Sequence, residues 1–157
     1  MSKRIIVSTL MSLLWLVGSS AEATNSLNIE QDGISNRAAI LQATIEPFSD
    51  HNDATISQKG SGNTALIRQD SDANVAAIAQ VSPASGIGFD DGNQAEIQQS
   101  SNGNHFAEIA QEAEFYANNR ARIGQNGDPQ EAYIVQVGGG NRANIDQSIG
   151  GNYFSLV

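Results

Sequence analysis

Side-chain amides recur along this chain at a regular spacing, and hydrogen bonding is the chemistry that they can perform. Each repeat reads Asn-x-Ala-x-Ile-x-Gln, and the repeats that begin at Asn52, Asn63 and Asn74 are eleven residues apart. A side-chain amide has two N–H donors and one carbonyl acceptor, so stacked repeats can bond to the repeats above and below them. The pattern therefore predicts ladders of hydrogen-bonded amides.

Catalytic chemistry has no comparable basis in the sequence. Cysteine is absent, and the two histidines, His51 and His105, lie far apart in the repeat scheme. Neither a Gly-x-Ser-x-Gly motif nor a phosphate-binding loop occurs. The acidic pair Asp90-Asp91 lacks the spacing of a calcium-binding loop. We expect both histidines to face solvent, and we predict no enzyme activity, no cofactor and no metal site.

The repeats extend from residue 25 to the end of the chain. Regular repeats begin at Asn36, Asn52, Asn63, Asn74, Asn93, Asn119 and Asn141. Variants begin at Asn25 and Gln130, one repeat has an extra residue between Asn104 and Ala107, and the last, from Asn152, ends before its glutamine. A constant internal period of this kind predicts stacked repeats.

The four named positions of each repeat alternate with variable, mostly polar positions. In a β-strand this places Asn, Ala, Ile and Gln on one face and the variable residues on the other. The period of two favours strand over helix. Small residues after the glutamines predict tight corners between strands. They are Gly33, Gly60, Gly127 and Gly138, with Ser71, Ser82 and Ser101 in the same place elsewhere.

A single strand with only Ala and Ile on its inner face cannot bury that face alone. We predict an all-β fold, a two-sheet parallel β-solenoid of about eleven strand-and-turn units of eleven residues, paired into coils of 22 residues. The two strands of a coil run in opposite directions, so each Ala faces an Ile and each Asn faces a Gln.

This register assigns every amide and core position. One glutamine ladder would contain Gln42, Gln69, Gln99, Gln125 and Gln147, and the other Gln31, Gln58, Gln80, Gln111 and Gln136. The asparagines at the other edge of the inner face are Asn36, Asn52, Asn63, Asn74, Asn93, Asn119 and Asn141. The core isoleucines are Ile40, Ile56, Ile67, Ile78, Ile97, Ile109, Ile123, Ile134 and Ile145.

The first 23 residues have the pattern of a secretory signal peptide. Lys3 and Arg4 precede the apolar run Ile5–Val17, and Ala21-Glu22-Ala23 is a cleavage signal. Removal of residues 1–23 would leave one repeat domain, 24–157, with six basic and sixteen acidic residues, a net charge of −10. That charge argues against nucleic acid as a partner. No second apolar run is long enough to form a transmembrane segment.

The variable positions and the inserts predict further features. We expect the inserts Ala43–His51, Val81–Gly92 and Glu112–Asn118 to be looped-out corners, or alternatively gatekeepers that slow aggregation. On the outer faces Arg122 should lie beside Glu96, and Arg120 beside Arg142. A second outer patch is apolar and consists of Val75, Ala77, Ala79, Tyr133, Val135 and Val137.

The stretch from Gln58 to Gln69, Gln-Lys-Gly-Ser-Gly-Asn-Thr-Ala-Leu-Ile-Arg-Gln, resembles the curlin repeat of bacterial curli subunits. The resemblance extends over almost all of residues 24–157. It implies an amyloid-like fold and a structural subunit of an extracellular curli-type fibre, which acts in cell adhesion and in the biofilm matrix. It also implies export through the periplasm and a dedicated outer-membrane secretion pore with accessory factors. The implied partners are further copies of the chain and other curlin subunits.

Neither Asn25 nor Asn152 has a charged or proline-rich cap beside it, so both ends of the stack should remain open for another chain. This favours a polymerising subunit. The alternative is a non-polymerising cell-surface repeat adhesin, or an accessory or nucleating subunit that binds the fibre.

Overall fold

The computed structural model describes residues 25–43, 52–71, 73–83, 92–101, 103–113, 118–148 and 154–156. The proposed signal peptide, most of each insert, His51 and Asp90-Asp91 lie outside these residues. The described residues form eleven strands: β1 (Ser26–Ile34), β2 (Arg37–Gln42), β3 (Asp53–Ser61), β4 (Thr64–Gln69), β5 (Val75–Val81), β6 (Gln94–Ser100), β7 (Phe106–Glu112), β8 (Arg120–Asn126), β9 (Glu131–Val137), β10 (Arg142–Ser148) and β11 (Phe154–Leu156). No helix in the described ranges is long and apolar enough to cross a membrane.

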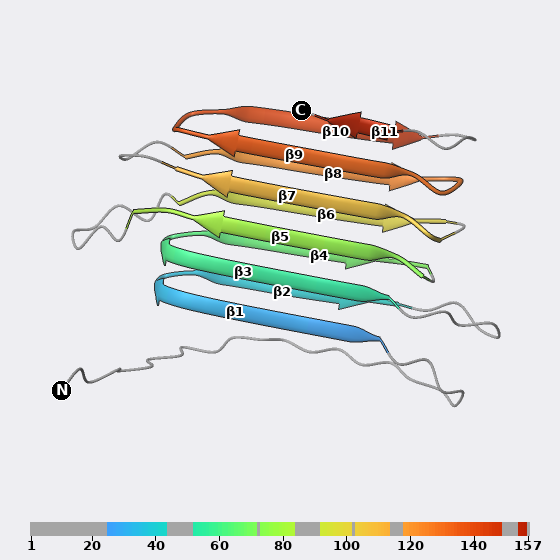
Figure 1. Ribbon diagram of the computed structural model, residues 1–157. Coiled ribbons are helices and arrows are strands. Elements are labelled where there is room, and N and C mark those ends of the chain that lie inside the picture. The colour runs from blue at the N-terminus through green and yellow to red at the C-terminus, as the bar shows by residue number, and fades with distance from the viewer. Residues whose placement is uncertain are drawn as a thin grey trace.

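The chain alternates between two sheets at every corner. The odd-numbered strands form a six-stranded sheet in the order β1-β3-β5-β7-β9-β11, which we call sheet A. The even-numbered strands form a five-stranded sheet in the order β2-β4-β6-β8-β10, which we call sheet B. Every neighbouring pair is parallel. Figure 1 shows one sheet in front of the other, with the strands of each sheet stacked along one common axis. The structure confirms the predicted two-sheet parallel β-solenoid.

The register places like residues on like residues through the stack. In sheet A, Ile56 pairs with Ile78 and Gln58 with Gln80. Sheet B repeats this arrangement, for example with Ile97 on Ile123. A shift by one residue would move the apolar side chains to the outer face, so burial strongly specifies this register.

The last strand departs from the expected register. The repeat pattern places Phe154 in the Ala position, but the structure pairs Ser155 with Ala132 and Phe154 with Glu131. That expectation is wrong by one residue. The last repeat contains neither the Ala-x-Ile pair nor the glutamine that fix the register elsewhere, so its sequence does not determine which residues face inward.

The core is a thin apolar layer between the two sheets. The nine isoleucines named above are all buried, and Ile56, Ile67, Ile97, Ile109, Ile123 and Ile134 have no exposed surface. The inner face is less covered at the β1 end, where Leu27 is 41% exposed and Ile29 is only partly buried. Each buried isoleucine contributes about 1.5–3 kcal/mol, so the first coil lacks much of the apolar stabilisation that the internal coils have.

Glycine is required where two successive corners approach each other closely. Gly60 has a φ of +95°, and a Cβ atom there would lie 1.9 Å from the carbonyl oxygen of Ser82 in the next coil. Gly138 also has a positive φ, of +87°, but a Cβ atom there would meet nothing within 4 Å. The corner at Gly60 therefore excludes a side chain both by conformation and by contact, and the corner at Gly138 only by conformation.

We predict that Gly60→Ala lowers the free energy of unfolding by roughly 2 kcal/mol or more, because strain and collision act together. Gly138→Ala should cost about 1–2 kcal/mol, since only the backbone conformation is unfavourable. Gly124→Ala is the control, because Gly124 has an ordinary φ and its added Cβ would have no neighbour closer than 3.6 Å. Denaturant midpoints of the freshly purified monomer test this order, and equal losses at Gly60 and Gly138 would contradict it.

Candidate functional site

Two continuous ladders of glutamine side chains run along the solenoid, one in each sheet. In sheet A the Nε2 atoms of Gln31, Gln58, Gln80 and Gln111 each donate to the Oε1 atom of the next glutamine, ending at Gln136. In sheet B the same bonds connect Gln42, Gln69, Gln99, Gln125 and Gln147. Donor–acceptor distances are 2.6–3.0 Å. Every one of these bonds points from the N-terminal coil towards the C-terminal coil, so the ladders have a direction.

The second N–H of these amides connects the two sheets. Gln58 in sheet A donates to the carbonyl oxygen of Arg37 in sheet B, at 2.9 Å, and Gln42 in sheet B donates to that of Ser26 in sheet A, at 3.1 Å. The same bond recurs up the stack to Gln147. The acceptor is always the residue after the Asn position, so each glutamine faces the asparagine end of the opposite strand.

Burial makes these amide bonds important for stability. Gln69 and Gln99 have no exposed surface, and Gln58 and Gln80 are each 1% exposed. A buried amide that lost its partner would cost about 1–3 kcal/mol. A carboxylate in the same position would have no N–H to donate, and like charges would stack at the strand spacing of about 4.8 Å. This accounts for an amide at this position in every coil.

The asparagines also form ladders, but through the backbone. The Oδ1 atoms of seven asparagines, from Asn25 to Asn119, accept the main-chain N–H of the residue in the same position one coil further on, at 2.9–3.2 Å. Most Nδ2 atoms instead bind the preceding corner, as that of Asn63 does at the carbonyl oxygen of Lys59, whereas the Nδ2 atom of Asn52 is buried without a partner. The asparagine therefore fixes the position of the corner, whereas the glutamine connects side chains along the axis.

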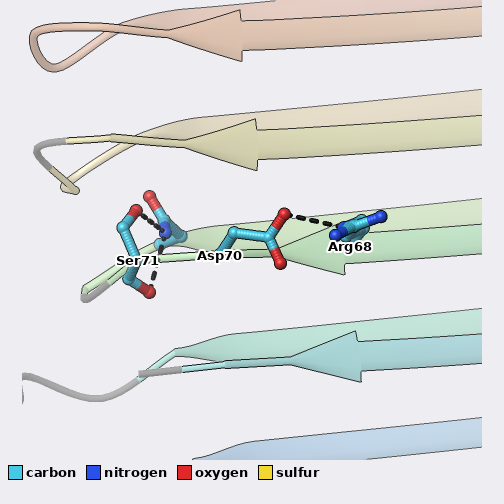
Figure 2. Close-up of polar contacts among 4 residues, drawn as sticks. Arg68, Asp70 and Ser71 are labelled. Carbon is cyan, nitrogen blue, oxygen red and sulfur yellow. Dashed lines mark hydrogen bonds and ion pairs between the residues drawn. The ribbon is translucent and has the colours of Figure 1, made fainter. Parts of the chain in front are cut away.

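The corner after β4 shows this arrangement in detail (Figure 2). The Nδ2 atom of Asn74 donates to the Oγ atom of Ser71 at 2.8 Å and to its carbonyl oxygen at 3.1 Å. On the outer side of the same corner, Arg68 and Asp70 form an ion pair of 2.7 Å. The serine thus supplies the acceptors that hold the asparagine where the corner has no glycine.

His105 interrupts the asparagine ladder of sheet A. It occupies the Asn position before β7 and is 1% exposed, so the expectation that it faces solvent is wrong. Its Nε2 atom lies 3.1 Å from the carbonyl oxygen of Ser100, while its Nδ1 atom is buried without a partner. Burial lowers its pKa below 6.5, against the raising effect of the Ser100 hydrogen bond. The expected alignment, with the extra residue between Asn104 and Ala107, is wrong: His105 holds the Asn position, and Asn104 is the extra residue. Asn104 turns the corner at a φ of 58°, which moves His105 into the inner face.

The next coil also departs from the repeat on its inner face. Gln130 occupies the Asn position after His105 and is 2% exposed. Neither its Nε2 nor its Oε1 atom has a hydrogen-bond partner. An asparagine at position 105 would place an amide oxygen where the imidazole lies. The sequence signal was available, since both residues depart from the repeat, but the pattern alone did not show that either is buried.

The N-terminal end of the stack presents acceptors. Gln31 is exposed, and the Oε1 atom of Gln42 is buried without a donor. At internal coils the corresponding oxygens receive an N–H from the coil before them. The β1–β2 end is therefore a site at which the amide ladders are incomplete. In the described part of the chain, no group of three or more His, Asp or Glu side chains is arranged to hold a metal ion.

We predict that Gln69→Ala lowers the free energy of unfolding by about 2–4 kcal/mol. The change removes the bonds to Gln99 and to two backbone carbonyls and leaves the Nε2 atom of Gln42 without its acceptor. The control is Gln98→Ala, on the outer face of the neighbouring strand β6 and next to the ladder residue Gln99, which should change stability by less than about 0.5 kcal/mol. Denaturant titration of both variants is the measurement, and similar losses would show that the ladder contributes little.

We predict that the structure loses stability as the pH falls from 7.5 to 5.5, in part through His105. Its folded pKa lies below the unfolded value of 6.5, so the unfolded chain binds the proton more strongly. This contribution is complete above pH 6.5 and is lost as the pH falls towards the folded pKa. His105→Asn should reduce the pH dependence of the stability. It should also protect the main-chain N–H of Gln130 from hydrogen exchange, because the Oδ1 atom of Asn accepts that N–H in the other coils. An unchanged pH profile would exclude this role for His105.

Comparison with known proteins identifies the repeat. Residues 117–148, which include β8, β9 and β10, match the family model described as the curlin associated repeat. The match covers 32 of the 157 residues. No curated protein and no solved structure matches the chain significantly. The coils before residue 117 continue the same parallel register and the same amide ladders. Residues 117–148 therefore contain a curlin associated repeat, and this match supports a structural, curli-associated function in general.

Proposed function

We propose that this protein is a structural subunit of an extracellular curli-type amyloid fibre, in which copies of the chain stack end to end along the solenoid axis. The observation that carries the proposal is the incomplete β1–β2 end. There Leu27 is 41% exposed, Gln31 is exposed and the Oε1 atom of Gln42 has no donor.

The backbone supports the same arrangement. Among the described strands, β1 pairs only with β3, and β2 pairs only with β4. Each therefore presents a row of unpaired N–H and C=O groups, which is a template for another strand. A second copy fits this template. On their paired side β1 and β2 already lie in register with an Ala, an Ile and a Gln of β3 and β4, and the other internal strands have the same three residues. Another sequence would have to supply both the apolar residues and the amide donor at the same spacing.

The family match supports a place outside the cell, and the sequence supplies a route. We propose that residues 1–23 are a signal peptide, that the chain crosses the periplasm and leaves through the curli secretion pore, and that it assembles at the cell surface. Accessory factors and other curlin subunits would be its partners there. Fibres of this kind would contribute to adhesion and to the biofilm matrix.

Fibre growth of the purified protein tests the proposal. We predict thioflavin-positive fibres with a cross-β repeat of about 4.8 Å. Growth only on preformed fibres would instead indicate an accessory subunit. A protein that stays monomeric for days at tens of micromolar would contradict polymerisation and leave the adhesin as the better candidate.

A matched pair of variants identifies the growing end. We predict that Leu27→Lys slows elongation at least tenfold, because stacking would bury an unpaired ammonium group on the inner face. The control is Asn28→Lys, in the adjacent, outward-facing position of β1, which should elongate like the wild type. Seeded elongation rates measure both, and equal rates would show that the β1 face does not receive another copy.

A further inference from the structure

The two outer faces of the solenoid carry opposite charge. Among the described residues, the outer face of sheet A has six acidic residues and one basic residue, a net charge of −5. They are Glu30, Asp32, Asp53, Glu108, Glu112 and Glu131, with Lys59. The outer face of sheet B and its β4 corner have five basic and three acidic residues, a net charge of +2. They are Arg37, Arg68, Arg120, Arg122 and Arg142, with Asp70, Glu96 and Asp146.

Acids and arginines also lie at the same height along the axis. The coil β7–β8 has Glu108 and Glu112 on one face and Arg120 and Arg122 on the other. In the coil β9–β10, Glu131 lies on one face and Arg142 on the other. The first two coils have the same arrangement, with Glu30 and Asp32 across from Arg37, and Asp53 across from Arg68. A sideways translation of one copy, without any axial shift, therefore places the acidic face against the arginine-bearing face at the same height in these four coils. The coil β5–β6 is an exception, because its one charged outward side chain is Glu96 in sheet B.

Unlike Arg68, which pairs with Asp70 at 2.7 Å, the arginines of β8 have weak partners within their own chain. The Nε atom of Arg122 is 3.8 Å from Glu96, and both side chains are more than 40% exposed. The guanidinium group of Arg120 binds the neutral amide oxygen of Gln94 at 3.0 Å. Arg142 lies in register on Arg120, and like charges directly opposite each other are unfavourable. An acidic group from outside the chain would relieve this repulsion.

The surface at these arginines can receive such a group. Arg120, Arg122 and Arg142 line an open hollow of about 520 Å³ on the outer face of sheet B. The face of sheet A would also gain from being covered, because Val135 is 58% exposed and Val137 is 64% exposed. Charge, position and exposed apolar area thus favour the same contact.

We propose that neighbouring fibres associate side by side, with the acidic outer face of sheet A in one fibre against the arginine-bearing outer face of sheet B in the next. The proposal rests on the fibre assembly proposed above, and its occupant is a second copy of this chain. The contact joins two different faces, so it does not close on itself and extends into ribbons. A pure translation keeps all fibre axes pointing in the same direction.

Charge reversal on each face tests the contact. Fibres of three variants are compared with wild type by the width of bundles in electron micrographs and by low-speed pelleting in 10 mM salt. The variants are Arg120→Glu/Arg142→Glu, Glu108→Lys/Glu131→Lys, and the combination of all four changes. Thioflavin fluorescence shows that each variant still forms fibres. We expect each double variant to lower the pelleted fraction at least fivefold, and we expect the fourfold variant to restore it. Wild-type bundles should separate in 1 M salt, where the Debye length is about 3 Å.

Net charge alone predicts a different result. From the net charge of −10 expected for residues 24–157, Glu108→Lys/Glu131→Lys gives −6, which would by itself favour association. Bundling that persists in either double variant, or a fourfold variant that stays dispersed, overturns the proposal. If the wild-type chain forms no fibres, the proposed function fails. Sedimentation velocity of the monomers in 10 mM salt then tests the contact between the two faces. The contact requires that the wild-type chain associates in a salt-sensitive way and that both double variants lose this association.

Discussion

Parallel, in-register stacking at the strand spacing is the constraint on which the rest of this structure depends. An inner face of one Ala and one Ile per strand is too thin to hold two sheets together by apolar contact alone. The backbone hydrogen bonds and the glutamine ladders add the directional interactions that hold successive coils in register. Each glutamine uses one N–H along the axis and one across the core, so the same side chain sets the register within a sheet and the alignment between sheets.

This constraint also connects the fold to assembly. A directional ladder cannot be satisfied at its first member, and the Oε1 atom of Gln42 is a buried acceptor without a donor. Leu27 shows the same deficit in apolar burial. What stabilises each internal coil is therefore missing at the end coil, and in the proposed fibre another coil of the same kind would supply it. The proposed polymerisation thus depends on the same hydrogen bonds that stabilise the fold.

The inner face keeps the same residue types from coil to coil, and the outer faces carry the variation in sequence. Ala, Ile and Gln recur in coil after coil, so differences between repeats are concentrated on outward positions, where sheet A is acidic and sheet B carries most of the arginines. His105 and Gln130 are exceptions on the inner face. Their unpartnered polar atoms show that these departures from the repeat leave buried polar groups without hydrogen bonds.

The sequence by itself determined the strands, their inward residues and the identity of the stacked positions, because alternation and a constant period are local properties of the chain. It failed at the last repeat, which has no Ala-x-Ile pair or glutamine, and at His105, which an extra corner residue moves inward. Only the tertiary structure decided that along the axis the glutamine oxygens accept side-chain N–H groups and the asparagine oxygens accept main-chain N–H groups, and that the glutamine ladders share one direction. Those choices depend on which acceptor lies within about 3 Å in the adjacent coil, a distance that no pattern along the chain contains.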